Sequence, residues 1–427
     1  MRGPGLSVDR FTPMSSTDST PAPLRDHHAD PARATSHALG FGQGVALIFG
    51  TNIGAGILSL PYAARNGGFL ALVVALAIAG TLTTISMLYV AEVSLRTKEP
   101  LQLSGLAERY LGQAGRFLVF AAIVINSIGA LIAYASGSGQ LMHNLFGLPP
   151  LAGTLIFYTL GSYIMWKGLQ ATGFTEGLIT SGMAVIIFTL VTWTMVGPGI
   201  ELSNLWVLKP YFIIPIMNLA VFTFLAQYVV PEMARGMAET KPEALPKAII
   251  AGMGITAFTL AAVPFAALGL LGTDVTEVVT IAWGEKLGTV AYYMANLFAL
   301  LAMFTSFLAI GFTAMRNVLD IFHWPEDGWQ RVAATALTVL PPLLIALAGL
   351  GGFVSALTYA GGFAGAIMSV VPVLLLHRAR KSGDQIPVWQ VRGVDHVGIQ
   401  ATIIVVYVAA FIYSVVSLLG FVPAGWA

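Results

Sequence analysis

The sequence contains no cysteine and few charged residues. Without cysteine, disulfides, thiolate metal sites and iron–sulfur clusters are excluded. Charged residues make up only 10% of the 427 residues, against about 25% in ordinary soluble domains. The net charge of +1 gives no basic excess, so no nucleic-acid partner is expected. The chain is instead 56% hydrophobic with a mean hydropathy of +0.80, which excludes an ordinary soluble protein.

Apolar runs of roughly 20 residues, long enough to cross a bilayer as a helix, recur along the chain. They predict an all-α integral membrane protein with eleven transmembrane helices, here called spans 1 to 11. With the N-terminus inside, 18 of the 21 Lys and Arg residues fall on the cytoplasmic side. This predicts a multi-pass protein of the plasma (inner) membrane, embedded in the lipid bilayer, with its N-terminus cytoplasmic and its C-terminus outside. The expected span centres lie near residues 53, 82, 131, 158, 185, 224, 258, 302, 338, 365 and 409.

Two interruptions divide the spans into related halves. Span 1 is interrupted at residues 50–56 and span 6 at residues 225–232, about 175 residues later. The connection after span 2 is expected inside and its counterpart after span 7 outside. Equal spacing with opposite sidedness predicts an inverted repeat of five plus five spans, with span 11 peripheral to it. The expected division is a disordered cytoplasmic tail at 1–39, repeats at 40–196 and 197–376, and an inner loop with span 11 at 377–427.

The interruption in span 1 combines glycines with a polar Thr-Asn pair, and Pro61 follows; all are poor material for a helix in lipid. Free N–H groups where a helix restarts suit a carboxylate, and carbonyls where a helix ends suit an ammonium. Two such breaks match both ends of a zwitterionic amino acid. The alternative is that the glycines only permit close helix packing. The predicted substrate-binding residues are Thr51, Gly54, Ala55, Gly56, Ile57, Tyr134, Phe222, Thr223 and Ala226.

Tyr134 belongs to this group because its hydroxyl lies mid-membrane in span 3 and needs a partner. A cation site is expected beside it. Thr305 and Ser306 in span 8 offer adjacent hydroxyls, and an opened helix at Gly50 and Ile53 offers carbonyls, so Na⁺ would find oxygen ligands there. The alternative is that these hydroxyls bond carbonyls of their own helix.

Glu232 is an ionisable residue close to the second interruption. It is a candidate for proton coupling, although a Glu after a Pro in the first turn of a helix also serves as ordinary capping. The sequence has no His-x-x-His motif, no acidic metal cluster and no Walker loop. We therefore expect neither an enzyme nor an ATP-driven pump, and no cofactor apart from Na⁺ or H⁺ as the coupling ion.

A resemblance to a known family rests on four motifs. They are GTNIGAGILSLP at residues 50–61, LAERYLG at 106–112, the Ala-Tyr pair at 133–134, and KPEALPKAI at 241–249. Over roughly residues 40–420 the chain resembles the amino acid/auxin permease group and its bacterial aromatic and hydroxy amino acid permeases, within the amino acid–polyamine–organocation superfamily. The resemblance implies the leucine-transporter fold, with spans 1 and 6 broken, and secondary active uptake of amino acids.

The resemblance also bears on the coupling ion. Sodium-coupled members of this fold place ligands in span 8 and at the break of span 1. Proton-coupled relatives often carry a lysine in span 5, and residues 174–196 contain none, which favours Na⁺. The bacterial aromatic permeases are nonetheless usually described as proton-driven, so both ions stay open. The implied sodium ligands are Gly50, Ile53, Ala302, Thr305 and Ser306.

The sequence thus predicts an ion-coupled symporter of neutral amino acids, aromatic ones among the candidates, that works by alternating access. The alternatives are a transporter of polyamines or other cationic amines, and an amino acid receptor that does not transport. The choice of amino acid, symport against exchange, and the oligomeric state are left open by the sequence.

Overall fold

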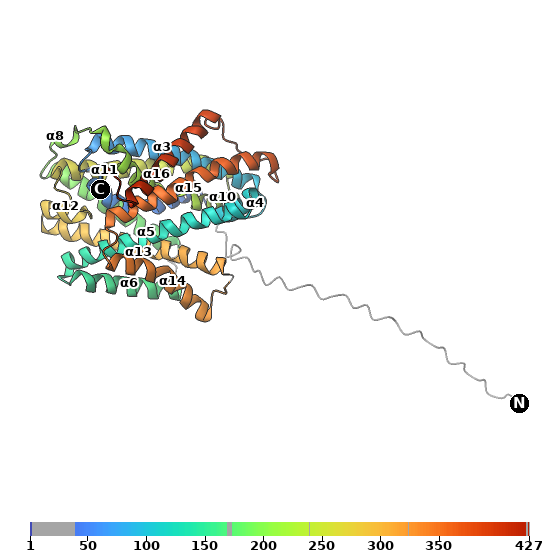
Figure 1. Ribbon diagram of the computed structural model, residues 1–427, viewed down its shortest axis with the longest axis horizontal. Coiled ribbons are helices and arrows are strands. Elements are labelled where there is room, and N and C mark those ends of the chain that lie inside the picture. The colour runs from blue at the N-terminus through green and yellow to red at the C-terminus, as the bar shows by residue number, and fades with distance from the viewer. Residues whose placement is uncertain (2–38, 169–172, 239, 323, 424–425, 427) are drawn as a thin grey trace. The chain divides into compact units, whose positions relative to one another are not determined.

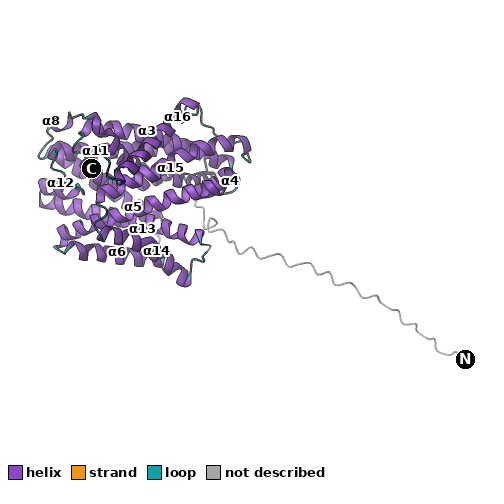
Figure 2. Ribbon diagram, in the orientation of Figure 1, coloured by secondary structure: helices purple, strands orange, loops and turns teal. Residues whose placement is uncertain are grey.

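The computed structural model describes residues 39–168, 173–238, 240–322 and 324–423, with Met1 and Trp426; of residues 173–180 it describes the backbone alone. Within these ranges the chain forms helices joined by turns, and no strand occurs (Figure 2). The long helices of residues 39–423 run side by side (Figure 1). The all-α membrane architecture is confirmed. The tail predicted at 1–39 lies almost entirely outside the described residues.

The helices have the following bounds in chain order, with η marking 3-10 turns. They are α1 (Phe41–Asn52), α2 (Ala55–Ala64), α3 (Phe69–Arg96), α4 (Leu103–Leu111), α5 (Gln113–Phe146), α6 (Pro150–Lys167), α7 (Gly173–Val196), α8 (Leu202–Leu205), η2 (Pro210–Phe212), α9 (Ile213–Thr223), η3 (Gln227–Val229), α10 (Val230–Ala238), η4 (Pro242–Ala244), α11 (Leu245–Leu271), α12 (Thr280–Leu287), α13 (Thr289–Ile321), α14 (Gly328–Leu347), α15 (Phe353–Ser382) and α16 (Val397–Leu418).

Eight stretches of the described chain are long and apolar enough to cross a membrane, one of them Pro210–Ala238, which includes the break in span 6. The number is nine when the bent pair α1 and α2 counts as one span. The prediction of eleven spans also needs α6 and α7. α6 has 18 residues but is not among the helices apolar enough to be counted. α7 is described with its side chains only from Ser181 to Val196, which is too short to be counted. The chain is therefore a multi-pass membrane protein, and the number eleven stays a prediction.

Span 1 is broken where the sequence predicts a break. α1 ends at Asn52, α2 begins at Ala55, and the two helices are bent by 53°. Gly54 between them has φ −150° and ψ −144°, so helical geometry does not continue through it. Pro61, expected to disfavour helix, is instead accommodated inside α2. Because proline has no N–H, it leaves the carbonyl of Ile57 without its usual intrahelical donor.

Span 6 is broken as well. α9 ends at Thr223, a 3-10 turn begins at Gln227, and α10 begins at Val230. The interruption therefore starts one residue earlier and ends sooner than the predicted 225–232. Pro231 explains the early restart: it is the second residue of α10, where a missing N–H costs no helical hydrogen bond.

The broken span 6 lies inside the bundle, against α15. In the apolar windows of span 6 and α15, 72% of residues are buried, against 28% for α14 and α16. Small residues in α15 permit this packing. A Cβ added to Gly361 would lie 1.9 Å from the carbonyl oxygen of Asn218, and one added to Gly365 would lie 2.2 Å from Cγ1 of Val221. Glycine at these positions lets the α15 and α9 backbones approach closely.

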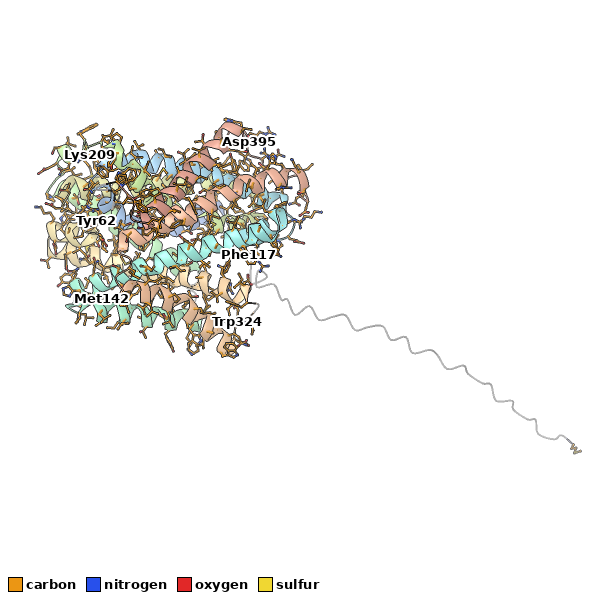
Figure 3. The ribbon with its side chains drawn as sticks, in the orientation of Figure 1. Tyr62, Phe117, Met142, Lys209, Trp324 and Asp395 are labelled. Carbon is orange, nitrogen blue, oxygen red and sulfur yellow. The ribbon has the colours of Figure 1, made fainter. Side chains whose placement is uncertain are left out.

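Residues of predicted outer and inner connections lie at opposite ends of the helices (Figure 3). Tyr62 and Lys209 lie at one end, and Phe117, Trp324 and Asp395 at the other. Spans that cross a membrane in alternating directions require this separation. Which end faces the cytoplasm rests on the distribution of Lys and Arg and stays a prediction.

A buried carboxylate ties α3 to α15 at the end that carries Asp395. Glu92 is 0% exposed and accepts hydrogen bonds from Arg96 Nε (2.8 Å), Arg380 Nε (2.8 Å), Arg380 Nη2 (2.9 Å) and the Val391 N–H (2.8 Å). Arg380 also donates to Asp395 at 2.6 Å, and this bond holds the pKa of the Asp395 carboxyl below its ordinary value. These partners compensate the burial of the Glu92 charge, which gives it a structural role.

Candidate functional site: the meeting point of two broken spans

The two breaks meet at Gly56. A Cβ added to Gly56 would lie 2.4 Å from Cγ2 of Thr223 and 3.4 Å from Cδ1 of Phe222. Because Gly56 is in the first turn of α2 and Thr223 is the last residue of α9, the start of one half-helix faces the end of another. The structure thus brings together two groups of residues that the sequence places about 165 positions apart.

The start of α2 presents free peptide N–H groups. The first N–H groups of any α-helix lack an intrahelical partner, and Gly54 at the N-cap has no side chain to supply one. Ala55 and Ile57 are each 1% exposed, and Gly56 is also buried. Buried N–H groups at the positive end of a helix dipole form a binding site for an anion such as a carboxylate.

The end of α9 presents carbonyl oxygens. The Phe222 carbonyl accepts the N–H of Leu225 at 3.3 Å, and the Ala226 carbonyl accepts the N–H of Val229 at 3.3 Å. Among the described residues, no hydrogen bond reaches the Thr223 carbonyl. This carbonyl is therefore the best placed of the three to accept a hydrogen bond from an ammonium, and the other two each retain a second lone pair.

The end of α1 and the middle of α13 come together beside this site. The N–H of Ile53 donates to the carbonyl of Phe49 at 2.9 Å, which is the last hydrogen bond of the α1 helix. The carbonyls from Gly50 onward therefore lie in the last turn, where helical carbonyls have no donor from their own helix. A Cβ added to Gly54 would lie 2.9 Å from Oγ of Ser306. The structure thus places one of the two predicted span-8 hydroxyls directly against the break in span 1.

Three of the predicted hydroxyls bond carbonyls of their own helices. Thr305 donates to Ala302 at 3.1 Å, Thr51 donates to Leu47 at 2.7 Å, and Thr223 bonds within α9 in the same way. This is the alternative arrangement that the sequence left open for such groups. Ser306 is thus the hydroxyl of this set that faces another element of the site.

Tyr134 joins the site from α5. Its side chain is 1% exposed, and its hydroxyl is close to the side chain of Ser306, which places it beside the break in span 1. Tyr228, at the break in span 6, interacts electrostatically with Tyr134. Tyr228 is not among the site residues predicted from the sequence. The available signal was its position two residues after Ala226, where a polar tip interrupts an apolar span.

Two buried amide side chains at the breaks were also missed. Asn52, the last residue of α1, donates to the sulfur of Met253 at 3.5 Å, and Gln227 donates to Oγ of Ser369 at 3.1 Å. In the described part of the chain, Oδ1 of Asn52 and Oε1 of Gln227 have no hydrogen-bond partner. Buried acceptors of this kind are expensive in an apolar interior. A donor supplied by a bound ligand would therefore stabilise each of these oxygens.

Glu232 lies apart from these residues. It is in the first turn of α10 and its side chain is exposed, whereas Tyr134 and Ser306 lie inside the bundle. Among the described residues, no hydrogen bond or ion pair joins Glu232 to Tyr134 or Ser306.

Two broken spans whose ends meet inside a bundle of long apolar helices define a membrane transporter of the broken-helix class. The sequence profile of the tryptophan/tyrosine permease family matches residues 38–416. This chain belongs to that family, whose members are amino acid permeases and not enzymes.

Curated relatives and solved structures agree with this assignment. The tyrosine-specific transport system 1 of Haemophilus influenzae is 27% identical over 364 residues, which cover 80% of this chain and 90% of the relative. The tryptophan-specific transport protein of the same organism is 24% identical over 372 residues, covering 80% and 88%. The crystal structure of MhsT in complex with L-phenylalanine superimposes with a TM-score of 0.64 at 16% identity, covering 90% of this chain and 99% of that one. The fold implied by the family resemblance is confirmed.

Proposed function

We propose that this protein is an ion-coupled symporter that carries neutral aromatic amino acids across the plasma membrane by alternating access. The observation that carries the proposal is the contact between the uncapped, buried start of α2 and the carbonyl end of α9 at Gly56 and Thr223. The names of the relatives, which are tyrosine-specific and tryptophan-specific transporters, support aromatic substrates.

In this proposal the substrate carboxylate binds the N–H groups of Ala55, Gly56 and Ile57. The ammonium binds carbonyls at the end of α9, with Thr223 as the principal acceptor. The hydroxyl of Tyr134 adds a hydrogen bond from α5. Each end of the zwitterion then meets the pole of a helix dipole that has the opposite sign, which offsets the loss of water around the two charges.

The coupling ion proposed is Na⁺, bound beside the substrate. Its ligands would be the carbonyls of Gly50, Ile53 and Ala302 and the hydroxyls of Thr305 and Ser306. The position of Ser306 against Gly54 supports this site. Coupling to H⁺ through Glu232 is the alternative, and the exposure of that side chain favours it less.

The orientation proposed has the N-terminus in the cytoplasm and the C-terminus outside, because the excess of Lys and Arg marks the cytoplasmic loops. Asp395 and Lys209, which this orientation assigns to opposite sides of the membrane, lie at opposite ends of the helices (Figure 3).

Uptake into proteoliposomes tests the proposal. The purified full-length protein would be given radiolabelled tyrosine, tryptophan, phenylalanine, glutamine and putrescine, with Na⁺ and pH gradients imposed separately. We expect concentrative uptake of the aromatic amino acids that depends on the Na⁺ gradient. Uptake of putrescine alone would favour a cation carrier, and binding of an amino acid without accumulation would favour a receptor; either result contradicts the proposal.

A further inference from the structure

The last helix, α16, carries two fully buried polar side chains on one face. Tyr407 and Ser414 are each 0% exposed, although the helix as a whole is among the least buried of the candidate spans. They are seven residues apart, which places them two turns apart on the same side of an α-helix. In a membrane interior such groups must find partners within the protein. Their hydrogen-bond partners lie in α3, in α9 and in α16 itself.

Tyr407 connects α16 to the C-terminal end of the break in span 6. Its hydroxyl lies 2.5 Å from Oγ1 of Thr83 in α3 and is close to the side chain of Ser369 in α15. Oγ of Ser369 in turn accepts a hydrogen bond from Nε2 of Gln227 at 3.1 Å. Thr83, Ser369 and Gln227 are all 0% exposed. A group of buried, neighbouring polar side chains therefore extends from α16 to the first residue of η3.

Ser414 connects α16 to the other side of the break. Asn218 in α9 donates through Nδ2 to Oγ of Ser414 at 2.7 Å and to the carbonyl of Ala410 at 3.2 Å. The space for this pair comes from Gly362 of α15. A Cβ there would lie 1.8 Å from Oγ of Ser414 and 2.4 Å from Nδ2 of Asn218. The hydrogen bond between α9 and α16 is therefore buried at a point where α15 has a glycine in place of a side chain.

The two connections enclose the broken segment. Asn218 precedes the non-helical residues 224–226 and Gln227 follows them. We propose that α16 is a positioning element of the transporter, with Tyr407 and Ser414 holding the break in span 6 in place from outside the site. Neither residue contacts the proposed substrate. Both act through other side chains by fixing the peptide groups to which the ammonium would bind, and this part of the inference rests on the proposed function.

The physical argument concerns preorganisation. A backbone segment without helical hydrogen bonds has more freedom than a helix, and binding a substrate to it costs the free energy of ordering it. Contacts at both flanks remove much of that freedom before the substrate arrives. Loss of one contact should therefore weaken binding without removing any group that binds.

Substitutions in α16 test this directly. Tyr407→Phe and Ser414→Ala each remove one hydroxyl and are expected to raise the KM for L-tyrosine about five-fold, the effect of one buried hydrogen bond, with Vmax within about two-fold of wild type. Tyr413→Phe is the matched control. That hydroxyl is on the same helix but donates to the carbonyl of Trp426 at 3.5 Å and not to Thr83 or Asn218, and its loss should leave KM unchanged.

A second measurement needs no substrate. Hydrogen–deuterium exchange of the amides at residues 224–229 should be faster by about five-fold in Tyr407→Phe, and unchanged in Tyr413→Phe. Ser369→Ala should reproduce the effect, and Ser369→Thr, which keeps the hydroxyl, should restore slow exchange. These variants cover the case in which Tyr407→Phe does not fold.

The two measurements separate the two proposals. If the wild-type protein takes up no amino acid, the proposed function fails, while exchange still tests the role of α16. If exchange at 224–229 is the same in wild type, Tyr407→Phe and Ser369→Ala, the positioning role is overturned even when uptake is normal. Equal rises in KM for Tyr407→Phe and Tyr413→Phe would overturn it as well.

Discussion

Gly56 of α2 lies directly against Thr223 of α9, with 2.4 Å between the position a Cβ would take and Cγ2 of the threonine. The contact joins the N–H groups at the start of one half-helix to the carbonyls at the end of the other. A side chain at position 56 would have to separate the two half-helices. Any such separation displaces both groups of peptide atoms that the proposed site uses.

The first prediction concerns this contact. Gly56→Val should weaken L-tyrosine binding by roughly ten- to hundred-fold, because overpacking of a closely packed contact costs about 1–3 kcal/mol. Equilibrium binding to the purified protein measures this effect. Gly254→Val in α11 is the control, since a Cβ there meets nothing within 4 Å. Tight substrate binding by Gly56→Val would contradict the proposed amide site.

The second prediction distinguishes two adjacent hydroxyls of α13. Ser306→Ala should raise the Na⁺ concentration that gives half-maximal uptake by about ten-fold, because Ser306 lies against the break in span 1, and one charge-assisted contact is worth about 1.5 kcal/mol or more. Thr305→Ala should have the smaller effect, since Thr305 donates to the carbonyl of Ala302. Sodium titration of uptake in proteoliposomes gives both values.

Thr313→Ala is the control for this pair. Its hydroxyl is on the same helix and bonds the carbonyl of Ala309 at 2.9 Å on an exposed face. Its loss should leave the sodium dependence unchanged. If Ser306→Ala keeps the wild-type sodium requirement, the ion does not bind beside Gly54.

The break in span 1 could be predicted because its causes are local. Glycines and a Thr-Asn pair disfavour a helix in lipid wherever they occur, and α1 indeed ends at Asn52, with Gly54 as the non-helical residue directly before α2. The break in span 6 was placed one residue late and ended too late, because Pro231 was taken as part of the interruption. In the structure proline serves as an early residue of the new helix, a position it tolerates well.

Contacts between distant residues could not be predicted in the same way. Asn218 and Ser414 are 196 positions apart, and neither differs in type from polar residues that bond their own helices. Only the path of α16 past α9 brings them together. Thr305 shows the opposite case: its type and position suit an ion ligand, yet its hydroxyl bonds within α13.

The third prediction concerns the stability of the bundle. Glu92→Gln should destabilise the protein by about 3–5 kcal/mol, because it removes a buried charge, leaves Arg96 without an anionic partner and leaves Arg380 paired with Asp395 alone. Thermal unfolding in detergent would show this as a large fall in the melting temperature.

Glu326→Gln provides the comparison. Glu326 pairs with Arg316 at 3.1 Å, but the two side chains are 44% and 42% exposed, so water already screens the pair. The loss should be below about 1 kcal/mol. If the two variants unfold at the same temperature, the contacts of Glu92 contribute no more than a surface ion pair. The connection it makes between α3 and α15 would then have to be maintained by apolar packing alone.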